Sequence, residues 1–153
     1  NGNKVRALRE KFPGLITPDF REMYDIEERM KKVDEVTQLP EPIFLIGSSF
    51  GGLASALAYQ RWSERFSGYL LLAPALHWEA AKEVEKVPKA SLVIHGYEDD
   101  VVPIESSRKF CQKLGVPLLG VGAGHRLAEV RPLIVSMAEI VYRNSLPIAS
   151  SEQ

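Results

Sequence analysis

The chain has 153 residues, a length that suits one domain and is short for two. Its 45% hydrophobic and 25% charged residues are typical of a globular protein with a core. A formal net charge of −1 without a basic block argues against nucleic acid or an anionic membrane surface as a partner. No apolar run approaches the roughly 20 residues of a membrane span. Cys111, the single cysteine, excludes an internal disulfide, is expected to be a buried packing thiol, and fits a reducing, cytoplasmic location.

Apolar runs and amphipathic stretches alternate along the chain. The apolar runs predict strands over residues 15–17, 43–46, 68–73, 91–95 and 117–121. Spacings of three and four residues between apolar side chains predict helices over residues 4–12, 21–37, 53–62, 103–114 and 126–142, the last with an interruption near Pro132. Residues 75–88 form a short insert, and residues 144–153 a tail that frays. The alternation predicts one α/β domain over residues 1–153 with a mainly parallel sheet.

The stretch Gly-Ser-Ser-Phe-Gly-Gly, residues 47–52, lies between a predicted strand and a predicted helix. In this setting Gly-x-Ser-x-Gly is the pattern of a nucleophile elbow, whose strained turn holds the central hydroxyl above the sheet edge. We expect Gly47 and Gly51 to remove side chains that would collide where the strand packs on the helix. Ser49 is therefore the candidate nucleophile, and Ser48 is expected to support the turn. The backbone N–H of Phe50 is the candidate oxyanion donor.

A serine hydroxyl is a poor nucleophile unless a base accepts its proton and a third group orients that base. Loops at the carboxyl ends of parallel strands meet at one edge of the sheet, so the later loops should converge on the elbow. His125 follows the glycine-rich turn after the last predicted strand and is the candidate base. Two neighbouring carboxylates follow an earlier strand. Asp99 is placed to reach inward, and Asp100 is better placed to face solvent, but either can orient the imidazole.

Other residues near these loops have plainer expected roles. His95 ends a predicted strand and is expected to be structural. His77 and Trp78 either line the pocket or lie on the surface, and Leu76 and Trp78 are the candidate substrate-binding residues. The insert that carries them is too short for a large lid, which predicts an open site for small or short-acyl substrates. The sequence indicates no metal site.

Three motifs together resemble the signatures of the α/β-hydrolase superfamily: Gly-Ser-Ser-Phe-Gly-Gly, His-Gly-Tyr-Glu-Asp-Asp-Val-Val-Pro and Gly-Ala-Gly-His. The chain is similar to small, nearly lidless bacterial esterases of the YqiA type, whose first helix resembles residues 2–14. The resemblance implies a three-layer α/β-hydrolase fold with a minimal lid. It also implies hydrolysis of small-molecule carboxylic esters or thioesters without a cofactor. The residues carried over are Ser49, Asp99 and His125, with Phe50 as oxyanion donor.

The resemblance further predicts that the front of the chain is incomplete. In the family, a strand and a His-Gly-Phe type loop precede the first helix, and that loop gives the second oxyanion donor. The strand lies between those predicted here at residues 15–17 and 43–46. Because the chain starts at Asn1 and not at a methionine, we expect a native N-terminal segment of about ten or more residues to be missing. Direct pairing of the two flanking strands would contradict this expectation.

Two other functions stay open at this point. A noncatalytic hydrolase-like module that binds a ligand or a partner would suit the incomplete front, although the intact Ser-His-Asp set argues against it. A peptidase or a carbon–carbon hydrolase would use the same three residues on a different substrate. Activity on esters of different chain length and on peptide amides separates these functions.

Overall fold

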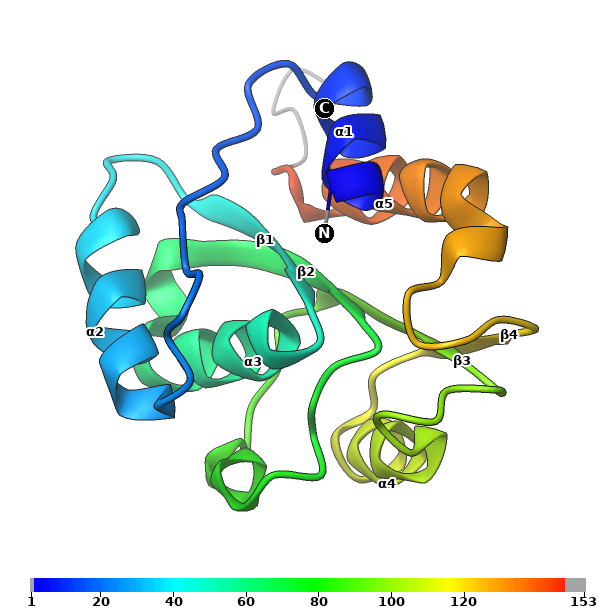
Figure 1. Ribbon diagram of the computed structural model, residues 1–153. Helices are drawn as coiled ribbons and strands as arrows, with labels where there is room; N and C mark the ends of the chain where they lie inside the picture. The colour runs from blue at the N-terminus through cyan, green and yellow to red at the C-terminus, as the bar shows by residue number, and fades with distance from the viewer. Residues whose placement is uncertain (1, 148–153) are drawn as a thin grey trace, which may run out of the picture.

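The structure is a computed structural model that describes residues 2–147. These residues form one parallel sheet with strand order β1-β2-β3-β4, enclosed between two layers of helices (Figure 1). The strands are β1 Ile43–Ser48, β2 Phe66–Leu72, β3 Ala90–Gly96 and β4 Leu118–Val121. The helices are α1 Gly2–Lys11, α2 Ile26–Val36, α3 Phe50–Trp62, α4 Ile104–Leu114 and α5 Arg131–Ser145. The predicted three-layer α/β fold class is confirmed. Of the tail expected to fray, residues 144 and 145 belong to α5, and residues 148–153 lie outside the described part.

The sheet buries both of its faces. Helices α2, α3 and α4 cover one face, and α1 and α5 cover the other (Figure 1). Side chains of β2 therefore alternate between two apolar clusters: Tyr69 and Leu71 pack toward α3, and Leu70 and Leu72 pack toward α5. All four are fully buried, as a central parallel strand requires. None of the described helices is both long and apolar enough to cross a membrane.

Two helices, α2 and α5, begin several residues later than the sequence predicts. Helix α2 begins at Ile26 because the Asp25 carboxylate accepts hydrogen bonds from two backbone N–H groups of the first turn and caps the helix there. Helix α5 begins at Arg131, and Pro132 lies in its first turn, where a missing N–H removes no helical hydrogen bond. Pro132 therefore starts α5 and does not interrupt it.

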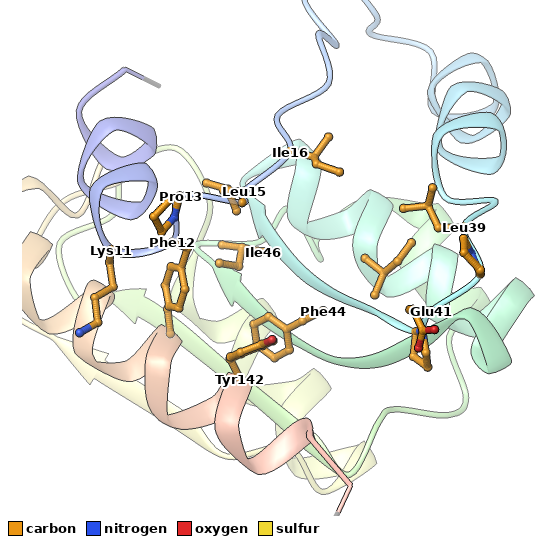
Figure 2. Close-up of a pocket in the computed structure, with 15 residues that line it drawn as sticks. Lys11, Phe12, Pro13, Leu15, Ile16, Leu39, Glu41, Phe44, Ile46 and Tyr142 are labelled. Atoms are coloured by element: carbon orange, nitrogen blue, oxygen red, sulfur yellow. The ribbon is translucent and has the colours of Figure 1, made fainter.

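The outer edge of β1 is open. Among the described residues β1 pairs only with β2, and the segment over residues 13–20 that faces its other edge has no regular structure. The predicted strand at residues 15–17 is therefore wrong, because no neighbouring strand lies within reach to hydrogen-bond with it. A groove of about 630 Å³ separates this segment from β1 (Figure 2). Its apolar lining includes Phe12, Leu15, Ile16, Phe44, Ile46 and Tyr142. Residues 15–17 and 43–46 do not pair directly in the described part of the chain, so the pairing that would have contradicted the expected missing strand is not found.

Candidate active site

The turn between β1 and α3 holds Ser49 in a strained backbone conformation, with φ 56° and ψ −117°. Two hydrogen bonds connect Ser49 to β2 and to the segment after it. The Ser49 N–H donates to the carbonyl oxygen of Leu72 over 2.9 Å, and the Ser49 carbonyl accepts from the N–H of Ala75 over 2.9 Å. Strand β2 and the residues that follow it therefore hold the serine at the carboxyl edge of the sheet.

The close packing of this turn depends on two glycines. A Cβ on Gly47 would lie 2.8 Å from the carbonyl carbon of Gly51, and one on Gly52 would lie 2.7 Å from the Cβ of Pro74. Both distances are shorter than a Cβ tolerates. At Gly51 the nearest atom to such a Cβ is 3.9 Å away, on Arg29. The expectation that Gly51 avoids a collision is therefore wrong, and Gly52 has that role.

The loops after β3 and β4 are tied to each other by their backbones. The N–H of Tyr97 donates to the carbonyl of Val121 over 2.8 Å, and the N–H of Glu98 donates to that of Ala123 over 3.1 Å. Gly96 permits this approach, because a Cβ there would lie 2.7 Å from the carbonyl carbon of Ala123. The two loops that carry the candidate acid and base therefore converge, as the parallel topology predicts.

Ser49, His125 and Asp99 form a continuous hydrogen-bonded chain across these loops. His125 Nδ1 lies 2.7 Å from Asp99 Oδ2, and His125 Nε2 lies 3.0 Å from Ser49 Oγ. An ionised carboxylate only accepts hydrogen bonds, so Nδ1 carries the proton and Nε2 is left to accept from the serine hydroxyl. The Asp99 side chain is fully buried, and the His125 side chain is 20% exposed.

The environment of Asp99 favours its charged form. Its Oδ1 accepts hydrogen bonds from the backbone N–H groups of Val101 and Val102, each over 2.8 Å. Burial opposes the charge, but the hydrogen bonds from His125 and from these two N–H groups outweigh burial and lower the pKa of Asp99. Asp100, the alternative carboxylate, is exposed. The geometry thus favours Asp99 as the partner of His125.

The remaining candidate residues divide between the site and the core. The backbone N–H of Phe50 is at the start of α3, and no backbone acceptor for it is found in the described part of the chain. Trp78 is 45% exposed, and the centre of its ring lies 5.1 Å from that of Phe50, the residue after Ser49. His77 is exposed and its ring lies 6.4 Å from that of Trp78. Leu76 is only 7% exposed and packs in the core.

Three residues beside the chain of hydrogen bonds were not expected there. Lys4 Nζ donates to Ser48 Oγ over 3.1 Å, and burial, followed by the charge of Arg126, lowers the pKa of Lys4. The Arg29 guanidinium lies 4.8 Å from the Phe50 ring centre, and His95 Nε2 lies 3.2 Å from Asp99 Oδ2. Nothing local in the sequence marks Lys4 or Arg29, because both reach the turn from other helices, α1 and α2. His95 precedes Asp99 by four residues, and this short spacing is a sequence signal that the two side chains lie close together. No cluster able to hold a metal ion occurs within residues 2–147.

Several solved structures share the fold of this chain. A protein of the α/β hydrolase superfamily from Xanthomonas campestris pv. campestris superposes with a TM-score of 0.76 at 22% identity, over 92% of this chain and 90% of that one. Est1E from Butyrivibrio proteoclasticus gives 0.74 at 16%, over 95% and 82%. Mouse alpha/beta hydrolase domain-containing protein 10 gives 0.75 at 16%, over 94% and 85%. These likenesses establish the fold. Among curated proteins, no sequence matches this chain significantly.

The sequence itself matches a family profile. The profile of the Serine hydrolase family covers residues 25–130, which include the elbow, both later loops and all three residues of the hydrogen-bonded chain. The protein therefore belongs to the Serine hydrolase family, within the α/β-hydrolase superfamily that the three motifs predicted. Hydrolysis is the activity that this membership assigns.

Proposed function

We propose that the protein hydrolyses carboxylic esters or thioesters of small or short acyl groups, with Ser49 as nucleophile, His125 as base and Asp99 as the group that orients His125. The observation that carries this proposal is the unbroken chain of hydrogen bonds from Ser49 Oγ through both imidazole nitrogens to Asp99 Oδ2. The strained turn at the nucleophile supports it, since strain of this kind collects at functional sites.

The proposed reaction has two stages. His125 Nε2 accepts the proton of the Ser49 hydroxyl as Ser49 Oγ attacks the acyl carbon. The imidazolium then donates that proton to the departing alcohol or thiol. The acyl group stays on Ser49 until water, activated by the same imidazole, releases the acid. The Asp99 carboxylate stabilises the imidazolium that forms in each stage. It can do so because it is buried and its lowered pKa keeps it ionised.

Three residues near Ser49 have proposed roles in binding the substrate. The N–H of Phe50 at the start of α3 has no backbone acceptor among residues 2–147 and is suited to donate to the oxygen of the tetrahedral intermediate. Trp78 presents a partly exposed ring against Phe50 and is the proposed wall for a small acyl group. Leu76 is proposed to act behind this wall, because its side chain packs in the core cluster that Phe50 borders.

A fluorophosphonate probe tests whether the serine is reactive. Wild-type protein should be labelled, and Ser49→Ala should abolish labelling. Ser48→Ala is the matched control, because it removes the neighbouring hydroxyl, which accepts from Lys4, and should retain labelling. Labelling that persists in Ser49→Ala, or no labelling of the wild type, would contradict the proposed nucleophile and favour a noncatalytic ligand-binding role.

A substrate panel tests the class of acyl compound. p-Nitrophenyl acetate, butyrate and octanoate, a thioester of acetate, and a p-nitroanilide of a short peptide should be compared by kcat/KM. We expect the acetate ester or thioester to be the best substrate and the octanoate ester to be at least about ten-fold poorer. Faster cleavage of the anilide would assign a peptidase, and a preference for octanoate would contradict the proposed small pocket.

A further inference from the structure

His95 is fully buried beside the proposed catalytic residues, and the reaction as described does not use it. It is the next-to-last residue of β3, and its ring lies between the loop that carries Asp99 and helix α4. Its Nδ1 lies 2.7 Å from Ser107 Oγ, and its Nε2 lies 2.9 Å from the carbonyl oxygen of Val102. The same Nε2 lies 3.2 Å from Asp99 Oδ2.

These contacts fix the tautomer of His95. A carbonyl oxygen only accepts, so Nε2 carries a proton that it donates to Val102, and Nδ1 accepts from the hydroxyl of Ser107. Burial lowers the pKa of His95 and keeps the ring neutral. The ionisable groups that face it are Asp99 and His125. The Nε2–H that donates to the Val102 carbonyl therefore also lies close to the Asp99 carboxylate, and its partial positive charge favours the negative charge there.

We infer that His95 is a positioning residue for the proposed acid, holding the Val102 carbonyl and the Asp99 carboxylate in the orientation that His125 requires. Val102 is the link between the two effects. Its carbonyl accepts from His95 while its N–H donates to Asp99 Oδ1, so one peptide segment transmits the position of the ring to the carboxylate. Ser107, itself fully buried on α4, completes the chain by holding the ring from the other side. This inference rests on the proposed function.

Removing the ring should loosen the acid without removing it. In His95→Ala the space left by the imidazole admits water to Asp99 Oδ2, which the wild-type fold fully buries. Water screens the carboxylate and weakens its hydrogen bond with His125. His95→Gln keeps an N–H donor of similar reach for the Val102 carbonyl and should restore most of the arrangement. Val93→Ala is the matched control, because Val93 is an equally buried residue of the same strand whose apolar side chain forms no hydrogen bond with Asp99 or Val102.

The experiment combines kinetics with a measurement that needs no substrate. For p-nitrophenyl acetate, we expect His95→Ala to lower kcat on the order of ten-fold with KM changed by less than about two-fold. In the proton NMR spectrum, the low-field Nδ1–H signal of His125 should shift upfield or vanish by exchange in His95→Ala and persist in His95→Gln. Because the chain has three histidines, few imidazole N–H signals have to be distinguished from that of His125. Val93→Ala should lower the melting temperature without affecting the signal.

The outcomes are distinct. If His95→Ala melts earlier but keeps the wild-type kcat and the wild-type signal, as Val93→Ala should, His95 has only a structural role and the inference is overturned. If His95→Ala does not fold, Ser107→Ala replaces it, with the same but smaller changes expected. If the wild type hydrolyses no ester, the proposed function fails, and the NMR signal still decides whether His95 positions Asp99.

Discussion

The two sides of the elbow differ in how completely their polar groups are paired. On the side of β3 and β4, backbone hydrogen bonds join the loops, and the side chains of His95 and Asp99 are fully buried with several partners each. On the other side, the edge of β1 has no strand beside it within the described residues, and an apolar groove runs along it (Figure 2). Ile16, on the rim of this groove, is 71% exposed.

This contrast separates the proposed Ser49–His125–Asp99 site from the open edge of β1. Ser49 is held by β2 and by the segment after it, through Leu72 and Ala75, so its position does not depend on a strand at the outer edge of β1. The open edge is nevertheless the side on which the family resemblance predicts the second oxyanion donor. The paired side should therefore be sensitive to single substitutions, and the open side tolerant of them.

The largest effect is expected from the buried acid. Asp99→Asn should reduce kcat by roughly 10⁴-fold, because an amide in this position stabilises the wrong imidazole tautomer and cannot balance the imidazolium charge. Asp100→Asn is the control and should leave kcat within about two-fold, since Asp100 is exposed. Ester hydrolysis measured at one saturating substrate concentration distinguishes the two. A reversal of these effects would assign the acid to Asp100.

The next effect concerns the turn itself. Gly47→Ala should lower the free energy of unfolding by about 2–3 kcal/mol, because its Cβ would collide with the carbonyl of Gly51 at the junction of β1 and α3. Gly51→Ala should be neutral or stabilising by about 0.5 kcal/mol, because it has room and lies in the first turn of a helix. Urea unfolding of the two variants measures the difference. An equal loss of unfolding free energy in both variants would contradict the inference that Gly47, and not Gly51, makes a close contact.

A smaller effect should appear on acidification. The folded state lowers the pKa of Asp99 below its unfolded value of about 3.9, so the carboxylate contributes stability that is fully present above that pH. The contribution is lost as the pH falls through the folded pKa, because protonation removes the advantage of the native hydrogen bonds. The stability difference between wild type and Asp99→Asn should therefore be constant from pH 5 to 7 and shrink below about pH 4. Urea unfolding across this range measures it, and a difference that grows at low pH would contradict the sign.

The smallest effect is expected at the open edge. Ile16→Asp should change the free energy of unfolding by less than about 0.5 kcal/mol, because this side chain is mostly exposed already. It should, however, reduce the fluorescence of a bound apolar dye by about half, since Ile16 belongs to the apolar lining of the groove. Val101→Asp is the control, because Val101 is 61% exposed and does not line the groove. Equal dye binding by wild type and both variants would indicate that the groove is not the dye site.

Local sequence determined the elbow and the order of the elements around it. An apolar run, a glycine-flanked serine and a helical run specify a strand, a turn and a helix in close succession, and the structure has β1, Ser49 and α3 in that order. Residues 15–17 look equally apolar but form no strand, because a strand so short depends on a neighbour that must be supplied from elsewhere. Sequence patterns predict which segments can be strands, and pairing decides which become strands.

The sequence by itself determined the fold class, the parallel sheet and the candidates Ser49, His125 and the Asp99–Asp100 pair, because periodicity and turn residues act over a few neighbouring positions. Tertiary structure alone decided that Asp99 faces His125, that Gly52 and not Gly51 makes the close contact, and that His95 lies against Asp99. It also brought Lys4 to the elbow from a helix 44 residues away. Apart from His95 and Asp99, these contacts join segments that are far apart in the chain, and their distances follow from packing, which no local pattern encodes.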